Sequence, residues 1–455
     1  MTKKKNKKGQ RPKISPVVKA RNRILRRPWR SQPGTPRVVS DYLAKAGLTC
    51  KLSTDLHEAD LLSRFGDAAV EYLNSCGIDR EVTAESHALT SPNLDMALAI
   101  RSKLWGDRYE EFLSWFTTAN LPPVERVLDI GCDIGIHTCF FAMQFPYAEV
   151  TGFDQCMKCI QCAQRLAERL NLKNVQFLQA TLPSLPEGLI NRKFDMVVSS
   201  CVAGYFDDAP LTPVRSIEEA QAQPLGPKQV EYARIQAGFL ANENSLLIAC
   251  DRFVFPRTLA RWIRGLREAG IYVHHDRIEL LEFINAWDEP ISIPVLVGSM
   301  RRTDLVTPDE IRKLWLVDFS GHGGELAYLM AAAEYFFLET SPKELLVGFR
   351  CTPPGAPTYC KELWKAGSSL LTYKYDASGG FLLEYDIENL PEILEGCRHA
   401  ARADSDGGTV EEYGPEAYSQ PPAGASDDSA ADRPAGETPA SEAVAGSGGQ
   451  DVPGT

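Results

Sequence analysis

The stretch VLDIGCDIGIHTCFFA, residues 127–142, limits the possible folds more than any other part of the chain. An apolar run ends at Asp129, Gly131 and Gly135 follow, and a helical pattern then begins. Glycines at such a turn permit a positive φ angle and let the backbone come close to a ligand. The stretch therefore predicts a strand, a glycine turn and a helix in direct succession.

Short apolar runs alternate with helical patterns in the residues that follow. This alternation predicts βαβ units and a mostly parallel sheet, which binds ligands at the carboxyl ends of its strands. We expect an α/β fold: a Rossmann-like, seven-stranded, mostly parallel sheet with flanking helices, plus an N-terminal helical region and a small C-terminal α+β module. The predicted strands are 126–130, 149–153, 175–178, 196–199, 246–249, 271–274 and 294–299, and the predicted helices include 156–170 and 257–269.

A second acid stands at the end of the next predicted strand. The segment VTGFD places Asp154 about 20 residues after the glycine turn. A carboxylate there can accept hydrogen bonds from both ribose hydroxyls of a nucleoside ligand. A glycine turn alone is weak support for such a ligand, whereas the turn and this acid in register are considerably stronger.

The two features together resemble class I S-adenosylmethionine-dependent methyltransferases. The first motif of that family has the form D-x-G-x-G-x-G, which Asp129, Gly131 and Gly135 match. Asp133 replaces the middle glycine; Asp is one of the residues that best tolerate left-handed backbone, and some branches of the superfamily carry Asn or Asp there. The segments KFDMVVSSCV and ENSLLIACD resemble the fourth and fifth strands of the family, and the resemblance covers residues 95–302.

The resemblance implies S-adenosylmethionine as the cofactor and methyl transfer to an acceptor near residues 199–204, after the fourth strand. In NVQFLQATL, Thr181 takes the place of the acid that is common at the adenine contact. The residues that the resemblance assigns to the cofactor are Asp129, Gly131, Asp133, Gly135, Asp154, Gln155, Ala180, Thr181 and Ser199.

The sequence singles out no methyl acceptor and no catalytic residue. The fourth strand is not followed by N-P-P-Y or D-P-P-Y, which disfavours methylation of exocyclic amines in DNA and of glutamine. Candidate bases are His137, Tyr205, Asp207 and Asp208, although each of these residue types is more often an ordinary surface or packing residue.

Two other interpretations stay open. A different nucleotide-binding α/β domain, such as a dinucleotide-binding oxidoreductase, also has a glycine turn, but its G-x-G-x-x-G pattern fits less well than D-x-G. A non-catalytic protein that keeps the fold and recruits partners through its tails and C-terminal module is the second. Asp133, Thr181 and the missing acceptor motif favour it.

Three cysteines follow Asp154 at the spacing of a ferredoxin, Cys156, Cys159 and Cys162. On a helix the first and third lie about 9 Å apart along the axis, so three thiolates converge poorly on one cluster. The fourth ferredoxin cysteine would fall on Leu166. We therefore predict no metal, and note that Cys156 at a helix N-terminus would have a lowered thiol pKa.

The chain divides into five predicted parts: a disordered basic tail at 1–36, a helical region at 37–94, the methyltransferase-like domain at 95–302, an α+β module at 303–400 and a disordered acidic tail at 401–455. The module reads as a strand KLWLVDF, a loop SGHGGE, a helix ELAYLMAAAEYFFLE, a strand ELLVGFR and a hairpin of SSLLTYKYD with GFLLEYD. The SGHGGE loop suits either a tight turn or an anion site at a helix N-terminus.

Charge is segregated along the chain, whose formal net charge is −11. Residues 1–30 hold 13 Lys and Arg and no acid, whereas residues 401–455 hold 11 acids and two Arg. An acidic body argues against a broad nucleic-acid groove. The basic segment 1–30 suits RNA or another acidic partner, and a solvated tail without a partner is the plain alternative.

Cysteine usage and hydropathy bear on the compartment. The 12 cysteines follow no small-domain spacing, which predicts reduced thiols and a cytoplasmic protein. No apolar run reaches the roughly 18–20 residues that span a bilayer, so we expect no membrane partner.

Overall fold

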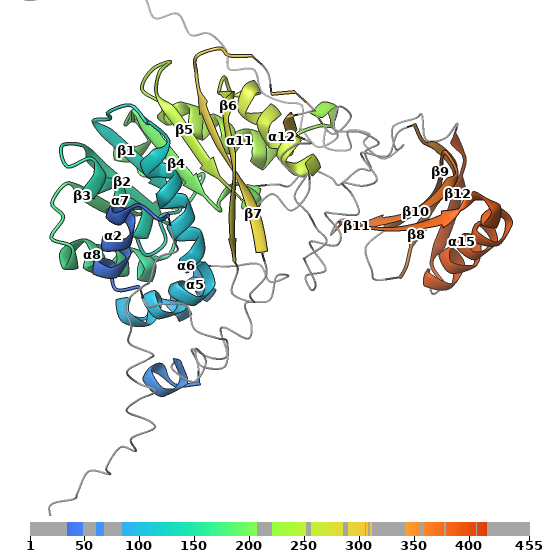
Figure 1. The fold of residues 1–455 in the computed structure, drawn as a ribbon, viewed down its shortest axis with the longest axis horizontal. Helices are drawn as coiled ribbons and strands as arrows, with labels where there is room; N and C mark the ends of the chain where they lie inside the picture. The colour runs from blue at the N-terminus through green and yellow to red at the C-terminus, as the bar shows by residue number, and fades with distance from the viewer. Residues whose placement is uncertain are drawn as a thin grey trace, which may run out of the picture.

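The structure is a computed structural model. It describes residues 34–48, 61–67, 84–206, 221–251, 256–284, 290–304, 306–307, 310–311, 342–354, 359–376, 379–405 and 407–415. Figure 1 shows a larger unit built on one sheet and a second, smaller sheet near the C-terminus. Within these ranges, no helix has both the length and the apolar character needed to cross a membrane.

The larger sheet has seven strands in the order β3-β2-β1-β4-β5-β7-β6. All run parallel except β7, which pairs antiparallel with both β5 and β6. The sheet confirms the predicted fold class and each of the seven predicted strands. Their bounds are β1 (Arg126–Ile130), β2 (Glu149–Asp154), β3 (Val175–Gln179), β4 (Met196–Ser200), β5 (Leu246–Cys250), β6 (Tyr272–Ile284) and β7 (Pro290–Ser299).

One face of this sheet is covered by helices from the N-terminal part of the chain (Figure 1). The longest, α6, has an Asn93 N-cap whose side chain accepts a hydrogen bond from the Met96 amide at 3.0 Å. Such a cap satisfies a backbone N–H that the helix itself leaves unpaired. The helices here are α2 (Arg37–Ala46), α5 (Ala84–Thr90), α6 (Leu94–Thr118), α7 (Ile136–Gln144) and α8 (Met157–Arg169).

The opposite face is covered by α11 (Pro227–Phe239) and α12 (Pro256–Glu268), with α9 (Glu187–Ile190) and a short 3₁₀ turn, η1 (Ala203–Phe206). The ring of Tyr232 stacks on Trp262, and both residues are almost completely buried. Apolar side chains of β1 and β4 alternate between this core and the other, so both faces of the parallel strands are buried.

The smaller sheet is antiparallel, with the strand order β11-β10-β9-β8-β12. Its β10–β11 pair is the predicted hairpin. Its elements are β8 (Glu344–Thr352), β9 (Tyr359–Ala366), β10 (Ser369–Asp376), β11 (Gly379–Asp386), the 3₁₀ turn η3 (Ile387–Asn389), α15 (Leu390–Asp404) and β12 (Thr409–Tyr413).

The predicted start of the acidic tail at residue 401 is wrong. Helix α15 continues to Asp404, and β12 pairs with β8 from Thr409 to Tyr413. The apolar side chains of Ala401 and Val410 pack into the core of the smaller sheet. The fold therefore continues beyond the residue at which the composition becomes acidic and polar. The predicted KLWLVDF strand, SGHGGE loop and ELAYLMAAAEYFFLE helix lie outside the described residues, as do the ends 1–33 and 416–455.

Candidate cofactor site

The turn after β1 has left-handed backbone at three positions. The φ angles are 69° at Gly131, 47° at Asp133 and 79° at Gly135. A Cβ added to Gly131 would lie 2.5 Å from Cγ2 of Val202, in the loop that follows β4. Only glycine keeps that space between the β1 and β4 loops open without strain.

Backbone hydrogen bonds fasten this turn to the end of β2. The amides of Gly131 and Cys132 both donate to the Phe153 carbonyl at 2.9 Å. The Asp133 amide donates to Oδ2 of Asp154 at 3.1 Å. The turn after β1 and the acid after β2 therefore form one hydrogen-bonded unit at the carboxyl edge of the sheet.

Asp154 stands at the end of β2 with its carboxylate held in place from two sides. Its Oδ1 accepts from the Cys156 amide at 2.8 Å, and its Oδ2 accepts from the Asp133 amide. Burial, together with the nearby Asp133, raises the pKa of Asp154 above its ordinary value. Each carboxylate oxygen can accept a second hydrogen bond, so two acceptor positions remain for a ligand diol.

Asp129 is buried beneath the turn. Its Oδ2 accepts a hydrogen bond of 2.5 Å from the Thr138 hydroxyl of α7. Burial raises the pKa of Asp129 to about 7. The buried Asp129 carboxylate therefore fixes the start of α7 against the end of β1. We propose that it supports cofactor binding indirectly, by holding this turn in place.

Asp133 is held by a partner that the sequence analysis missed. Arg101 of α6 donates from Nη2 to Oδ1 at 2.7 Å and from Nε to Oδ2 at 2.9 Å. The Arg101 side chain is 3% exposed and that of Asp133 is 23% exposed. Burial alone would raise the pKa of Asp133, but the Arg101 guanidinium holds it well below its usual range.

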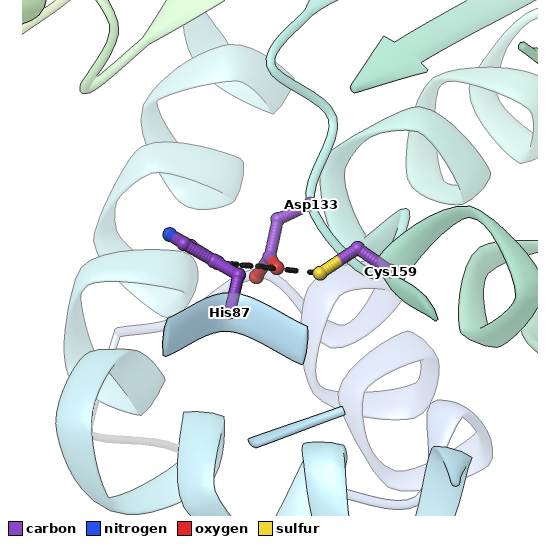
Figure 2. Close-up of side chains that lie close together, drawn as sticks. All are labelled: His87, Asp133 and Cys159. Atoms are coloured by element: carbon purple, nitrogen blue, oxygen red, sulfur yellow. Dashed lines mark hydrogen bonds and ion pairs between the residues drawn. The ribbon is translucent and has the colours of Figure 1, made fainter. Parts of the chain in front are cut away.

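Figure 2 shows Asp133 between His87 and Cys159. The ligand-type atoms of these three side chains lie within 4.8 Å of one another, which is close enough for a metal ion. The Arg101 guanidinium already contacts all three, at 3.4 Å from His87 Nδ1 and 4.0 Å from Cys159 Sγ. A buried cation at the centre of the group opposes a second one, so the absence of a metal remains our prediction for this group.

The other predicted cofactor residues lie at the neighbouring strand ends, with one exception. The Ala180 amide donates to the Asp154 carbonyl at 3.1 Å, and the Gln155 carbonyl accepts from Gln179 at 3.0 Å. Thr181 is exposed beside Ala180. Ser199 is fully buried on the opposite face of the sheet, where its hydroxyl lies 2.8 Å from that of Tyr232, and the structure does not bring it to the group.

The loop after β4 is the second edge of the site. Asp251, at the end of β5, accepts from the amides of Val202 at 2.5 Å and Ala203 at 2.8 Å. Cys201 has a φ of 57°, and its thiol contacts the Arg108 guanidinium. Its two hydrogen bonds fix the backbone of this loop, and burial raises the pKa of Asp251 to about 6.

Arg101 and Arg108 both extend from α6, seven residues apart. That spacing is two helical turns, or about 10.5 Å, and it places one guanidinium at the β1 turn and the other at the β4 loop. The only sequence signal for them is this seven-residue spacing, which places both arginines on one face of the helix. One helix therefore pins both loops that border the site.

Of the candidate bases, His137 lies in the aromatic core of the larger unit. Its ring packs against Tyr109, Phe112 and Phe141. Burial, with Arg108 nearby, lowers its pKa to about 3, so the ring is neutral at physiological pH. This placement supports a packing role. No side-chain geometry is described for Tyr205, and Asp207 and Asp208 lie outside the described residues.

Comparison with known proteins agrees with this geometry. A family described as "Methyltransferase domain" matches residues 123–224, which run from just before β1 past the β4 loop. The matched residues include the acid-bearing glycine turn and Asp154, the two features that resemble the class I family. The chain carries a class I S-adenosylmethionine-dependent methyltransferase domain. S-adenosylmethionine is the cofactor of this class.

Two curated proteins share short stretches with this chain. Trimethylguanosine synthase of Saccharomyces cerevisiae is 33% identical over 98 residues, 22% of this chain and 30% of that protein. An uncharacterised protein of Rickettsia prowazekii is 31% identical over 81 residues, 17% of this chain and 32% of that protein. The chain thus spans about a third of the length of each relative.

Solved structures with some likeness include a methyltransferase from Pyrococcus furiosus, 14% identical with a TM-score of 0.31, over 42% of this chain and 84% of that one. The ribosomal protein L11 methylase from Lactobacillus delbrueckii is 15% identical with a TM-score of 0.29, over 43% of this chain and 79% of that one.

Proposed function

We propose that this protein transfers the methyl group of S-adenosylmethionine to an acceptor that binds at the carboxyl end of β4. The observation that carries the proposal is the unit formed by the glycine turn and Asp154, joined by the hydrogen bond from the Asp133 amide. The unit stands at the carboxyl ends of parallel strands, where folds of this kind bind their ligands.

The residues present fit an adenosyl cofactor. Asp154 has acceptor capacity left for a ribose diol. Gly131 leaves open the space beside Val202 that a Cβ would fill. Asp129, Asp133 and Gly135 would hold the turn, and Gln155, Ala180 and Thr181 would border the base. When bound, the cofactor supplies an electrophilic methyl group, and this chain contributes by holding donor and acceptor in line.

The loop that borders the acceptor is held from both sides. Asp251 accepts from two successive amides, and Arg108 contacts Cys201 from the α6 side. We assign these two residues to positioning of the loop, because both act on its backbone or on a side chain of the loop. A fixed loop places an acceptor reproducibly, which is the larger part of catalysis in a displacement of this kind.

RNA is the acceptor class we propose to test first. The basic segment 1–30 forms a long-range attractor for polyanions, while the acidic body repels them. The short match to trimethylguanosine synthase, a protein named for a guanosine product, also favours RNA.

The cysteines within the described ranges are all free thiols, which supports our proposal of a cytoplasmic location.

The test is incubation of the full chain with methyl-labelled cofactor and separate pools of RNA, protein and small metabolites. We expect label in the RNA pool, sensitive to ribonuclease, and a steep fall of RNA binding with added salt. Deletion of residues 1–36 should abolish RNA binding and leave cofactor affinity unchanged.

Label in the protein or metabolite pool would refute the RNA acceptor and retain methyl transfer. Cofactor binding by calorimetry without label in any pool would favour the non-catalytic scaffold that the sequence left open. No cofactor binding would refute the proposal as a whole.

A further inference from the structure

Two cysteines stand one turn apart at the N-terminus of α8, directly after Asp154. Cys156 is the N-cap residue, with an extended backbone (φ −85°, ψ 108°), and Cys159 lies within the first turn. A C-x-x-C pair at the start of a helix in a βαβ unit is the arrangement that favours dithiol redox chemistry. Unlike an iron–sulfur cluster, such a pair needs no third or fourth cysteine.

The two cysteines occupy the N-cap and third positions of one helical turn, and their thiols differ in character. The Cys159 thiol and nearby backbone amides stabilise a thiolate at Cys156 and lower its pKa to about 6. The contact with Cys156 and burial raise the pKa of Cys159. A nucleophilic first thiolate and a protonated second thiol are what an exchange reaction needs.

Both thiols border the cofactor site. Cys156 is 3% exposed, but its neighbours Gln155 and Met157 are exposed, so it lies just beneath the surface. The Cys156 amide donates to Oδ1 of Asp154 at 2.8 Å. Cys159 Sγ contacts the Ser91 hydroxyl at 3.5 Å and belongs to the group around Asp133. The backbone of Cys156 is thus bonded to Asp154, and the Cys159 thiol lies beside Asp133.

We propose that Cys156 and Cys159 form a redox-active dithiol whose closure to a disulfide weakens cofactor binding at the adjacent Asp154. The thiolate of Cys156 attacks a sulfur of a small disulfide such as oxidised glutathione and releases one glutathione thiolate. Cys159 then loses its proton and attacks the Cys156 sulfur, which releases the second. Counted from the protonated dithiol, the protein loses two electrons and two protons, and the two released thiolates take up the protons and become thiols.

Closure brings the two sulfurs to about 2.05 Å from one another. That change pulls on the N-cap residue whose amide orders Asp154 and draws Cys159 away from Ser91. The effect on cofactor affinity rests on the proposed function, whereas formation of the disulfide does not.

Cys162 provides a matched control. It is buried on the same helix one turn further on, and its thiol donates to the Ser91 carbonyl at 3.6 Å. Burial raises its pKa to about 11, so it lacks the thiolate character of Cys156. The Cys162→Ser variant therefore tests whether disulfide formation is specific to Cys156 and Cys159 among the cysteines of this segment.

The experiment equilibrates the full chain with graded ratios of reduced and oxidised glutathione, blocks free thiols and maps disulfides without reduction. Trypsin cleaves after Lys158 and so separates the two cysteines. We expect the peptide ending at Lys158 to be linked to peptide 159–165 in the native chain and in Cys162→Ser. The link should be absent in Cys156→Ser and Cys159→Ser.

No link in the native chain at any ratio would overturn the proposal, as would a link that persists in Cys159→Ser and is lost in Cys162→Ser. The native chain decides this even where a serine variant fails to fold. Calorimetry then compares S-adenosylmethionine binding to reduced and oxidised chain, with an expected loss of tenfold or more on oxidation. Equal affinity would overturn the coupling. If the reduced chain binds no cofactor, the proposed function fails, and peptide mapping alone decides the dithiol.

Discussion

Replacement of Arg101 by Met should destabilise the larger unit more than the loss of a surface ion pair would. The variant leaves the Asp133 carboxylate without its two hydrogen bonds of 2.7 and 2.9 Å. Removing one partner of a buried ion pair costs about 3–5 kcal/mol. Because the Asp133 side chain is 23% exposed, we expect the lower end, about 3 kcal/mol of unfolding free energy.

The assay is urea unfolding of the full chain, followed by circular dichroism and by tryptophan fluorescence, since Trp105 and Trp115 lie on the same helix as Arg101. Arg192→Met is the control. Arg192 pairs with Glu149 at 2.9 Å, but those side chains are 30% and 71% exposed. Such a pair is worth about 1 kcal/mol or less.

A double variant, Arg101→Met with Asp133→Gly, separates charge from packing. It leaves no unpaired charge and puts glycine at a backbone φ of 47°, so it should recover about 2 kcal/mol relative to Arg101→Met. A loss below about 1 kcal/mol in the single variant, or no recovery in the double, would refute the reasoning.

The same pair has a defined pH dependence. The pKa of Asp133 in the folded state is depressed, so its stabilisation is present above the unfolded value of about 3.9 and disappears as the pH falls through the folded value. The deficit of Arg101→Met relative to the native chain should therefore shrink in strong acid.

Three further outcomes are expected. Gly131→Ala should lower stability by about 1–2 kcal/mol because of its left-handed φ and the contact with Val202, whereas Gly188→Ala, which meets no atom within 4 Å, should not; equal effects in thermal unfolding would contradict this. His137→Phe should fit among Tyr109, Phe112 and Phe141. The pKa of His137 is about 3 in the folded state and about 6.5 in the unfolded state, so the native chain loses stability as the pH falls below about 6.5. The variant should therefore gain up to about 3 kcal/mol relative to the native chain by about pH 4.5. Parallel pH–stability curves would refute the neutral buried ring. Asp251→Asn should leave cofactor affinity within about twofold while it slows methyl transfer, because Asp251 accepts from two amides of the β4 loop; a large loss in calorimetric affinity would place it at the cofactor instead.

The sequence was informative where local pattern determines structure. Alternating apolar runs located all seven strands of the larger sheet, since buried parallel strands are continuous apolar segments. The glycine turn and Asp154 were placed together because adjacent parallel strands end at one edge of a sheet. The hairpin of β10 and β11 followed from its glycine-containing turn.

What the sequence missed depends on contacts distant along the chain. Arg101 meets Asp133 only because α6 packs across the sheet, and a charged residue inside a helical pattern looks like surface. Ser199 was assigned to the site by position, but strand alternation turns its hydroxyl to the opposite face, toward Tyr232. Helix α15 and β12 extend past residue 401, because partners in the smaller sheet order residues whose composition alone suggests a tail.

Calorimetric binding of S-adenosylmethionine to the native chain, Asp154→Ala and Glu149→Ala tests the central claim most directly. Asp154 and Glu149 stand at opposite ends of β2. The control therefore removes an acid from the same strand at the end that lies away from the proposed site. We predict that the native chain and Glu149→Ala bind alike and that Asp154→Ala binds about 1–3 kcal/mol more weakly, roughly five- to 150-fold in Kd. A native chain that does not bind, or a folded Asp154→Ala that binds as the native chain does, would contradict the assignment of this site to the cofactor.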